Sequence, residues 1–164
     1  MPCPSWRDAL VLLQRRGCNI HMQGQTLNCA LKFHDKQAVA WLLAANADPE
    51  NTVEADLTPL RWAARTGDEF LVRTLLKACV AVNTRGKYGY TALMTAAMHG
   101  HSAVVGSLLA AGAEVNTNGD GETAIDLAHR FPEIAEALER HVKEYGWAWG
   151  KSNTAVTHKL LVVE

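Results

Sequence analysis

Several features that would point to other classes of protein are missing from this chain of 164 residues. It contains no run of 18 apolar residues, although 48% of its residues are hydrophobic, so we expect a packed core and no membrane-spanning helix. Its formal net charge at pH 7 is −1, which gives no indication of nucleic-acid binding. The first residues lack the basic and apolar segments of a secretory signal. We therefore expect an intracellular location, in the cytoplasm or alternatively in the nucleus.

Motifs of catalytic, metal and cofactor sites are also missing. The four cysteines form no C-x-x-C pair, and Cys18 and Cys29 fall on positions of the repeat described below, which predicts reduced thiols rather than zinc ligands. Residues 86–89 resemble a phosphate-binding loop only superficially, because the lysine spacing differs. His99 and His101 do not share a helical face, as a metal-binding pair would, and we interpret His101 as a helix-capping residue. The sequence thus predicts no catalytic residue, no cofactor and no metal.

What the chain does contain is an apolar triplet that recurs five times. Within each triplet the residues are spaced i, i+3 and i+4, which is one stripe of a helix. The steps between triplets are 30, 33, 33 and 29 residues. A unit of this length cannot bury its apolar face alone, so we expect the units to stack and to share an elongated core. The triplets are Ala9/Leu12/Leu13, Val39/Leu42/Leu43, Val72/Leu75/Leu76, Val105/Leu108/Leu109 and Ile134/Ala137/Leu138.

Capping residues indicate a further helix ahead of each triplet. Threonine is a good N-cap, and Pro59 follows one threonine at the first helical position, where proline lacks only an N–H that would be unpaired anyway. Gly67 and Gly100 are expected to end these first helices in the left-handed conformation, and Asp68 and His101 to begin the second helices. The N-cap positions in register are Gln25, Thr58, Thr91 and Thr123.

The second helices are predicted to end near Gly17, Asn46, Cys79 and Gly112. Glycine accepts left-handed backbone geometry, and asparagine does so nearly as well. Cysteine does not, so we expect a locally different ending at Cys79. The polar, glycine-containing stretches that follow should form projecting fingers or hairpin turns.

Three stretches of the sequence resemble ankyrin repeats: Thr58–Ala64 reads TPLRWAA, Thr91–His101 reads TALMTAAMHGH and Leu108–Asn116 reads LLAAGAEVN. The resemblance covers residues 6–144 and implies an all-α repeat solenoid, a stack of helix-turn-helix units with projecting β-hairpin or finger loops. The implied organisation is a half-repeat N-terminal cap at 6–24, repeats at 25–57, 58–90 and 91–122, a C-terminal capping repeat at 123–144, and a tail at 145–164.

Departures from the family pattern predict local differences. Gln25 and His34 stand where the family prefers Thr and Gly, which implies a weaker cap and a strained turn. The final unit is shortened between its helices, and its second helix is rich in charge, as expected of an end cap with one face in water. The tail is expected to fold over the edge of the last repeat. A partner-binding peptide and a cloning remnant are the alternatives for this segment.

Charge is distributed unevenly along the repeats. Residues 57–113 carry six basic and two acidic side chains, a net +4, and residues 114–144 carry three basic and eight acidic ones, a net −5. One interpretation is two solvated faces without a partner. The other is that the basic middle attracts an acidic ligand.

Partners of ankyrin-repeat proteins usually contact the fingers and the exposed side of the first helices, along a concave face. The resemblance therefore implies a binding set of basic, aromatic and apolar side chains, the kinds of residue that anchor interfaces. Trp62 and Trp41 are left out, because we expect Trp62 to wedge between units and Trp41 to pack partly on the convex side. The set is Lys32, Phe33, Leu57, Arg65, Thr66, Arg85, Lys87, Tyr88, Tyr90, Met98 and His99.

The resemblance thus implies a monomeric, non-enzymatic interaction module, an adaptor or scaffold for a protein partner with an acidic patch. The first alternative is a stoichiometric inhibitor or regulatory subunit of an enzyme, which would cover the active site of its partner. An enzyme and a nucleic-acid binder are remote alternatives. The sequence has no ladder of aromatic and basic residues of the kind that binds single strands.

Overall fold

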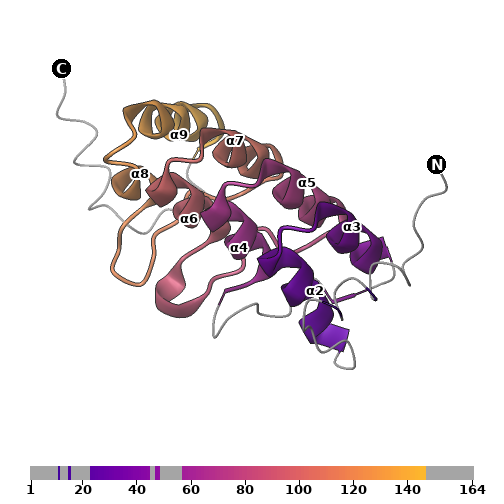
Figure 1. The fold of residues 1–164 in the computed structure, drawn as a ribbon. Helices are drawn as coiled ribbons and strands as arrows, with labels where there is room; N and C mark the ends of the chain where they lie inside the picture. Colours follow the sequence, from indigo (N-terminus) through magenta and orange to yellow (C-terminus); the bar gives the residue numbers. More distant parts are fainter. Residues whose placement is uncertain (1–10, 12–14, 16–22, 45–46, 49–56, 147–164) are drawn as a thin grey trace, which may run out of the picture.

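Two rows of helices build the molecule in the computed structural model, which describes residues 11, 15, 23–44, 47–48 and 57–146 (Figure 1). The first helices of the units lie side by side in one row, and the second helices lie in the other. Each first helix also packs against the second helix of its own unit. The first row is α2 (Gln23–Lys32), α4 (Pro59–Thr66), α6 (Ala92–His99) and α8 (Ala124–Leu127), and the second is α3 (Lys36–Ala44), α5 (Glu69–Lys77), α7 (Ser102–Ala110) and α9 (Pro132–Tyr145).

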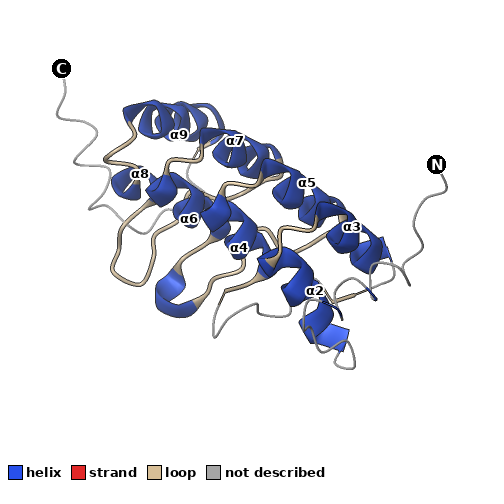
Figure 2. Cartoon of the chain, in the orientation of Figure 1, coloured by secondary structure: helices blue, strands red, loops and turns tan. Residues whose placement is uncertain are grey.

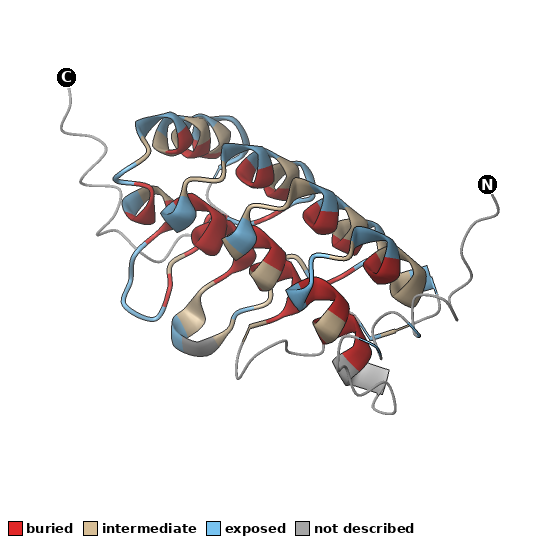
Figure 3. Ribbon diagram, viewed as in Figure 1, coloured by how far each residue is buried: buried red, intermediate tan, exposed pale blue. Residues whose placement is uncertain are grey.

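Loops, without a strand in the described ranges, join these helices (Figure 2). The sequence prediction of an all-α repeat solenoid is therefore confirmed. Buried residues gather where the two rows face each other (Figure 3). Within each described triplet the first apolar residue is buried, and Leu75, Leu108 and Leu138 have no exposed surface. Burying one such leucine contributes about 1.5–3 kcal/mol, so this shared core supplies much of the stability.

Threonine side chains begin the first helices as predicted. Thr58 accepts a hydrogen bond from the backbone N–H of Arg61 at 3.3 Å, and Thr91 accepts one from Met94 at 3.3 Å. Thr123 forms a full capping box with Asp126, in which each side chain accepts from the backbone of the other residue. Each such cap contributes about 1 kcal/mol.

The prediction for the first full repeat is wrong in where its first helix begins, although Leu27 and Ala30 are buried as their places in the repeat predict. Helix α2 begins at Gln23, so Gln25 lies inside the helix and does not mark its start. His34, however, does adopt the left-handed conformation that its position requires, with φ of 53°. This confirms the expected strain, since a residue with a Cβ atom is disfavoured there by about 1–2 kcal/mol.

Gly67 and Gly100 end α4 and α6 in the left-handed conformation, with φ of 73° and 80°. Each glycine also lies under an aromatic ring from the next repeat. A Cβ atom at Gly67 would come under 3.0 Å from the ring of His101, and one at Gly100 would come equally close to the ring of Phe131. These glycines therefore serve both the turn and the contact between neighbouring repeats.

The second helices begin in two different ways. Asp68 caps α5, because its carboxylate accepts from the backbone N–H of Leu71 at 3.2 Å. His101 occupies the same position before α7, but its side chain makes no capping hydrogen bond. Its Nε2 instead lies 3.1 Å from the carbonyl oxygen of Arg65 in the preceding repeat. His101 is therefore the N-cap residue by position, as predicted, but its ring links two repeats and does not cap the helix.

The end of α5 also differs from the prediction. Cys79 adopts a φ of 58°, the conformation that Gly112 adopts with 83° after α7. The backbone N–H of Cys79 donates to Leu76, and that of Gly112 donates to Leu109, at 3.1 and 3.0 Å. The two helices thus end alike, because packing of the stack imposes the same turn on cysteine in spite of the local cost. Asn46 and Gly17 lie outside the described residues.

Finger loops project from the first row of helices, as predicted. In the finger after α5, the Gly86 N–H donates to Tyr90 O at 3.0 Å across the short 3₁₀ helix η1 (Lys87–Gly89). In the finger after α7, an isolated antiparallel bridge joins Thr117 and Thr123. Figure 1 shows both fingers projecting below the first row of helices, near α6 and α8. Of the N-terminal half-repeat at 6–24 the structure describes residues 11, 15, 23 and 24, and of the tail at 145–164 it describes residues 145 and 146.

Candidate functional site

The predicted binding residues fall into two groups, which we call the helix-end group and the finger group. The helix-end group occupies two equivalent positions at the end of each first helix. Phe33 and Met98 expose 45% and 41% of their surfaces there, and Lys32, Thr66 and His99 are also exposed. The repeat therefore brings residues 33 apart in sequence to matching places along one row. The group consists of Lys32, Phe33, Arg65, Thr66, Met98 and His99.

Arg65 and Trp62 form a stacked pair at the centre of this row. The Arg65 guanidinium lies 4.6 Å from the centre of the Trp62 ring, an arrangement that attracts the cation to the aromatic face. Trp62 is half-buried and packs against the core, as expected of a residue wedged between units. The Thr66 hydroxyl donates within the helix, to Trp62 O and Ala63 O. Arg65 is thus held in place while part of its surface stays exposed.

His99 and His101 lie beside this pair as stacked rings, with centroids 6.2 Å apart. Nδ1 of His99 lies 2.9 Å from the carbonyl oxygen of Thr95, and His101 contacts Arg65 O. Each ring is therefore oriented by a backbone carbonyl. In the part of the chain that the structure describes, no three His, Cys, Asp or Glu side chains gather in a way that could hold a metal ion.

The finger group comprises Leu57, Arg85, Lys87, Tyr88 and Tyr90. Tyr88 exposes 66% of its surface and has a φ of 63°, which is rare for a bulky residue. Its carbonyl oxygen accepts a 2.7 Å hydrogen bond from the N–H of Gly119 in the next finger. The backbone that carries the Tyr88 side chain is therefore bonded to the neighbouring finger.

Tyr90 and Leu57 are placed differently from Tyr88. Both are half-buried, and Tyr90 packs against the hydrophobic core. Tyr90, a member of the predicted binding set, therefore also contributes to the packing of the fold. Arg85 is exposed, and the side chain of Lys87 lies outside what the structure describes.

The two acidic residues of the basic stretch 57–113 form ion pairs away from the predicted binding residues. Asp68 pairs with Lys36 at 3.2 Å, and Glu69 pairs with Arg73 at 2.8 Å, both on the second row of helices. In the described ranges no carboxylate lies within 4.0 Å of Arg65 or Arg85, so these two cations are not neutralised by an ion pair there. The positive charge of the middle repeats is thus displayed at the fingers and the first-helix ends.

Local sequence showed no sign of the contacts between repeats, in which the rings of His101 and Phe131 lie over the glycines. The sequence did hold a signal for these contacts, because an aromatic ring, His101 or Phe131, follows each of the two glycines by about 30 residues, roughly one repeat. None of the described helices is both long enough and apolar enough to cross a membrane.

Comparison with known proteins agrees with this architecture. A family model of ankyrin repeats in three copies matches residues 27–119 and, in a second overlapping placement, residues 60–145. The chain is also 32% identical over 105 residues to the ankyrin repeat domain-containing protein 63 of Mus musculus. That match includes 58% of this chain but only 27% of the mouse protein. Ankyrin repeats are generally protein-interaction modules. With two rows of stacked helices, projecting fingers and a family match over more than half of its length, the chain belongs to the ankyrin-repeat family.

Proposed function

We propose that this protein is a non-enzymatic adaptor or scaffold that binds a protein partner on its fingers and first-helix ends. The binding surface is the helix-end group together with the finger group defined above. Tyr88 is the observation on which the proposal rests. A bulky residue in the left-handed conformation persists only where the surrounding structure imposes it, and such positions concentrate at functional sites.

The chemistry of the surface supports a partner with an acidic patch. Arg65 and Arg85 are cations without a carboxylate neighbour in the described residues, and Tyr88, Phe33 and Met98 of the same two groups expose apolar surface. Arginine and tyrosine are among the residues that contribute most to interface affinity. We further propose that the chain is a monomer without its partner and that it is intracellular. Its described cysteines, Cys29 and Cys79, are free thiols, as is usual in a reducing compartment.

Replacement of Tyr88 by asparagine tests the proposal, because asparagine tolerates left-handed geometry and removes the aromatic anchor. Tyr88→Asn should raise the free energy of unfolding slightly, by up to about 1 kcal/mol, and lower the amount of captured partner at least tenfold. The measurement is affinity capture from cells that express the protein, with urea unfolding of the same variants. Capture should also weaken as salt is raised, since screening reduces attraction between charged surfaces.

Phe70→Asn is the matched control, since Phe70 exposes 50% of its surface on α5, in the second row. It should leave capture unchanged. Equal capture by Tyr88→Asn and the native chain would contradict the proposed surface. If the captured partner is an enzyme, a turnover assay with and without this protein separates a scaffold, which leaves the rate unchanged, from an inhibitor.

A further inference from the structure

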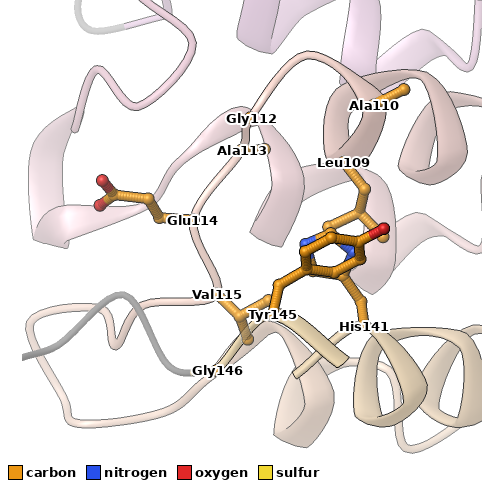
Figure 4. A pocket seen from close by; sticks show the side chains of 9 residues that line it. All are labelled: Leu109, Ala110, Gly112, Ala113, Glu114, Val115, His141, Tyr145 and Gly146. Atoms are coloured by element: carbon orange, nitrogen blue, oxygen red, sulfur yellow. The ribbon is translucent and has the colours of Figure 1, made fainter. Parts of the chain in front are cut away.

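A cavity of about 520 Å³ lies between the loop that follows α7 and the end of α9 (Figure 4). Leu109, Ala113 and Val115 line one side of it. His141 and Tyr145 line the other, with their rings 4.7 Å apart. One wall is therefore aliphatic and the other aromatic, which suits an apolar or aromatic side chain.

An asparagine one repeat earlier shows what the stack requires beside this cavity. Asn83, in the loop after α5, donates from Nδ2 to the carbonyl oxygen of Gly112 at 3.4 Å. Its Oδ1 accepts from the backbone N–H of Glu114 at 2.9 Å. The side chain of Asn83 thus joins its own loop to the corresponding loop of the next repeat.

Asn116 is the equivalent residue one period later, and its oxygen has no such partner. Asn116 is only 5% exposed, its Nδ2 donates to Glu114 Oε2 at 2.8 Å, and its Oδ1 is buried without a hydrogen bond. The reason lies in the last unit. Helix α7 ends one residue after Leu109, whereas α9 continues for seven residues past Leu138, the equivalent residue of its triplet. A helix therefore stands where the next loop would supply an N–H, and a buried acceptor without a partner costs about 1–3 kcal/mol.

The chain leaves the described region at the wall of the same cavity. Gly146 lines the cavity and has φ of 79° and ψ of 171°, a conformation that is essentially restricted to glycine. Trp147 and Trp149 follow directly in the sequence. At about 3.5 Å per residue, Trp149 can reach no further than about 10 Å from Gly146. Two indole side chains are therefore confined to the neighbourhood of the opening.

Charge also favours contact between residues 147–164 and the C-terminal end of the stack. Residues 147–164 contain Lys151 and Lys159 with Glu164 as the one acidic side chain, whereas residues 114–144 carry a net charge of −5. The side chains of the segment carry a net charge of +1, opposite in sign to that end of the stack, so the two attract each other.

We propose that this cavity is a docking site for the chain's own residues 147–164. The indole of Trp147 or Trp149 occupies the space against His141 and Tyr145, and a backbone N–H of the segment donates to Asn116 Oδ1. The segment thereby supplies a hydrogen-bond donor to Asn116, as the loop at Gly112 and Glu114 supplies one to Asn83 in the repeat before. The site is separate from the fingers and the first-helix ends.

Fluorine NMR of the full chain labelled with 5-fluorotryptophan tests the docking, with Trp147→Phe and Trp149→Phe variants to assign the signals. At least one of the two signals should lie away from the position that it has in urea. Ala110→Arg places a long charged side chain at the cavity wall and should return that signal to the urea position. Ala103→Arg, an exposed site on the same helix but outside the cavity lining, should leave it unchanged.

Three results would overturn the docking. The first is both signals at their urea positions in the native chain. The second is a displaced signal that ignores Ala110→Arg. The third is displacement that disappears on dilution, which would indicate that a second copy of the chain supplies the indole.

A double-mutant cycle tests the proposed hydrogen bond to Asn116. Asn116→Ala should lower the folding equilibrium constant about tenfold in the native chain, since it removes a bonded buried acceptor. In the Trp147→Ala/Trp149→Ala background the same substitution should lower the constant clearly less, because only the Nδ2 hydrogen bond to Glu114 is lost there and Oδ1 is already without a partner. Equal losses in the two backgrounds would refute the bond.

Discussion

At the scale of single residues, the left-handed positions of the backbone show where local preference and the stack agree and where they conflict. Gly67 and Gly100 agree, because they accept both the positive φ and the ring that covers them. His34, Cys79 and Tyr88 conflict, because a residue with a Cβ atom occupies the same region. The first two stand at helix ends, where the repeat requires the turn, and Tyr88 stands in an exposed finger.

Two glycine substitutions compare a position where positive φ and a close ring require glycine with a helical position where neither applies. Gly67→Ala should lower the free energy of unfolding by at least about 1–2 kcal/mol, since the new Cβ meets the His101 ring and φ is positive. Gly106→Ala should raise it by about 0.5–1 kcal/mol, because Gly106 lies inside α7 with open space around a Cβ. Urea unfolding of both variants measures the difference. Destabilisation by Gly106→Ala, or none by Gly67→Ala, would show that the close contacts do not control these sites.

At the scale of the element, the helices are short, and capping residues and packing determine where each one begins and ends. Helix α8 has four residues and depends on the capping box between Thr123 and Asp126, whereas α9 has fourteen and buries Ile134, Leu138 and Val142. Helices of eight to ten residues are marginal in isolation, so tertiary packing rather than intrinsic propensity maintains most of them.

Cys79→Gly tests how much the end of α5 costs. Glycine should raise the free energy of unfolding by about 1 kcal/mol, because it adopts the φ of 58° without the Cβ penalty. Cys79→Ala is the control, since alanine removes the thiol but retains the Cβ, and it should give no gain. Thermal unfolding of the three proteins provides the measurement. Equal stability of the glycine and alanine variants would indicate that the thiol, not the backbone, sets the difference.

At the scale of the whole molecule, each repeat is stabilised by its neighbours. Helix α6 packs against α4 on one side and α8 on the other, whereas the main contacts of α9 among the described elements are with α7 and α8. A stack of this kind has stability terms for each unit and for each interface, so the units at an end open first.

Hydrogen exchange followed by mass spectrometry should show this gradient. Backbone amides of α4, α5, α6 and α7 should exchange most slowly, and those of α8 and α9 should exchange faster, because they have a neighbouring repeat on one side only in the described stack. Leu93→Ala in α6 should accelerate exchange in α4 and α8 as well, as the shared core transmits the loss. Uniform protection from α4 to α9 would mean that the stack unfolds as a single unit.

Sequence alone determined the period, the helix pairs, the threonine caps and the glycine turns, because each depends on residues within a few positions of one another. It also indicated the finger residues, although their role as a binding surface stays a prediction. Only the tertiary structure decided that His101 contacts Arg65, that Tyr90 packs on the core, that Cys79 takes a glycine turn, and that Asn116 lacks a partner beside the terminal cavity. The reason is that these features depend on contacts between different repeats or on packing of the whole stack. A local sequence pattern does not show which residues become neighbours in this way.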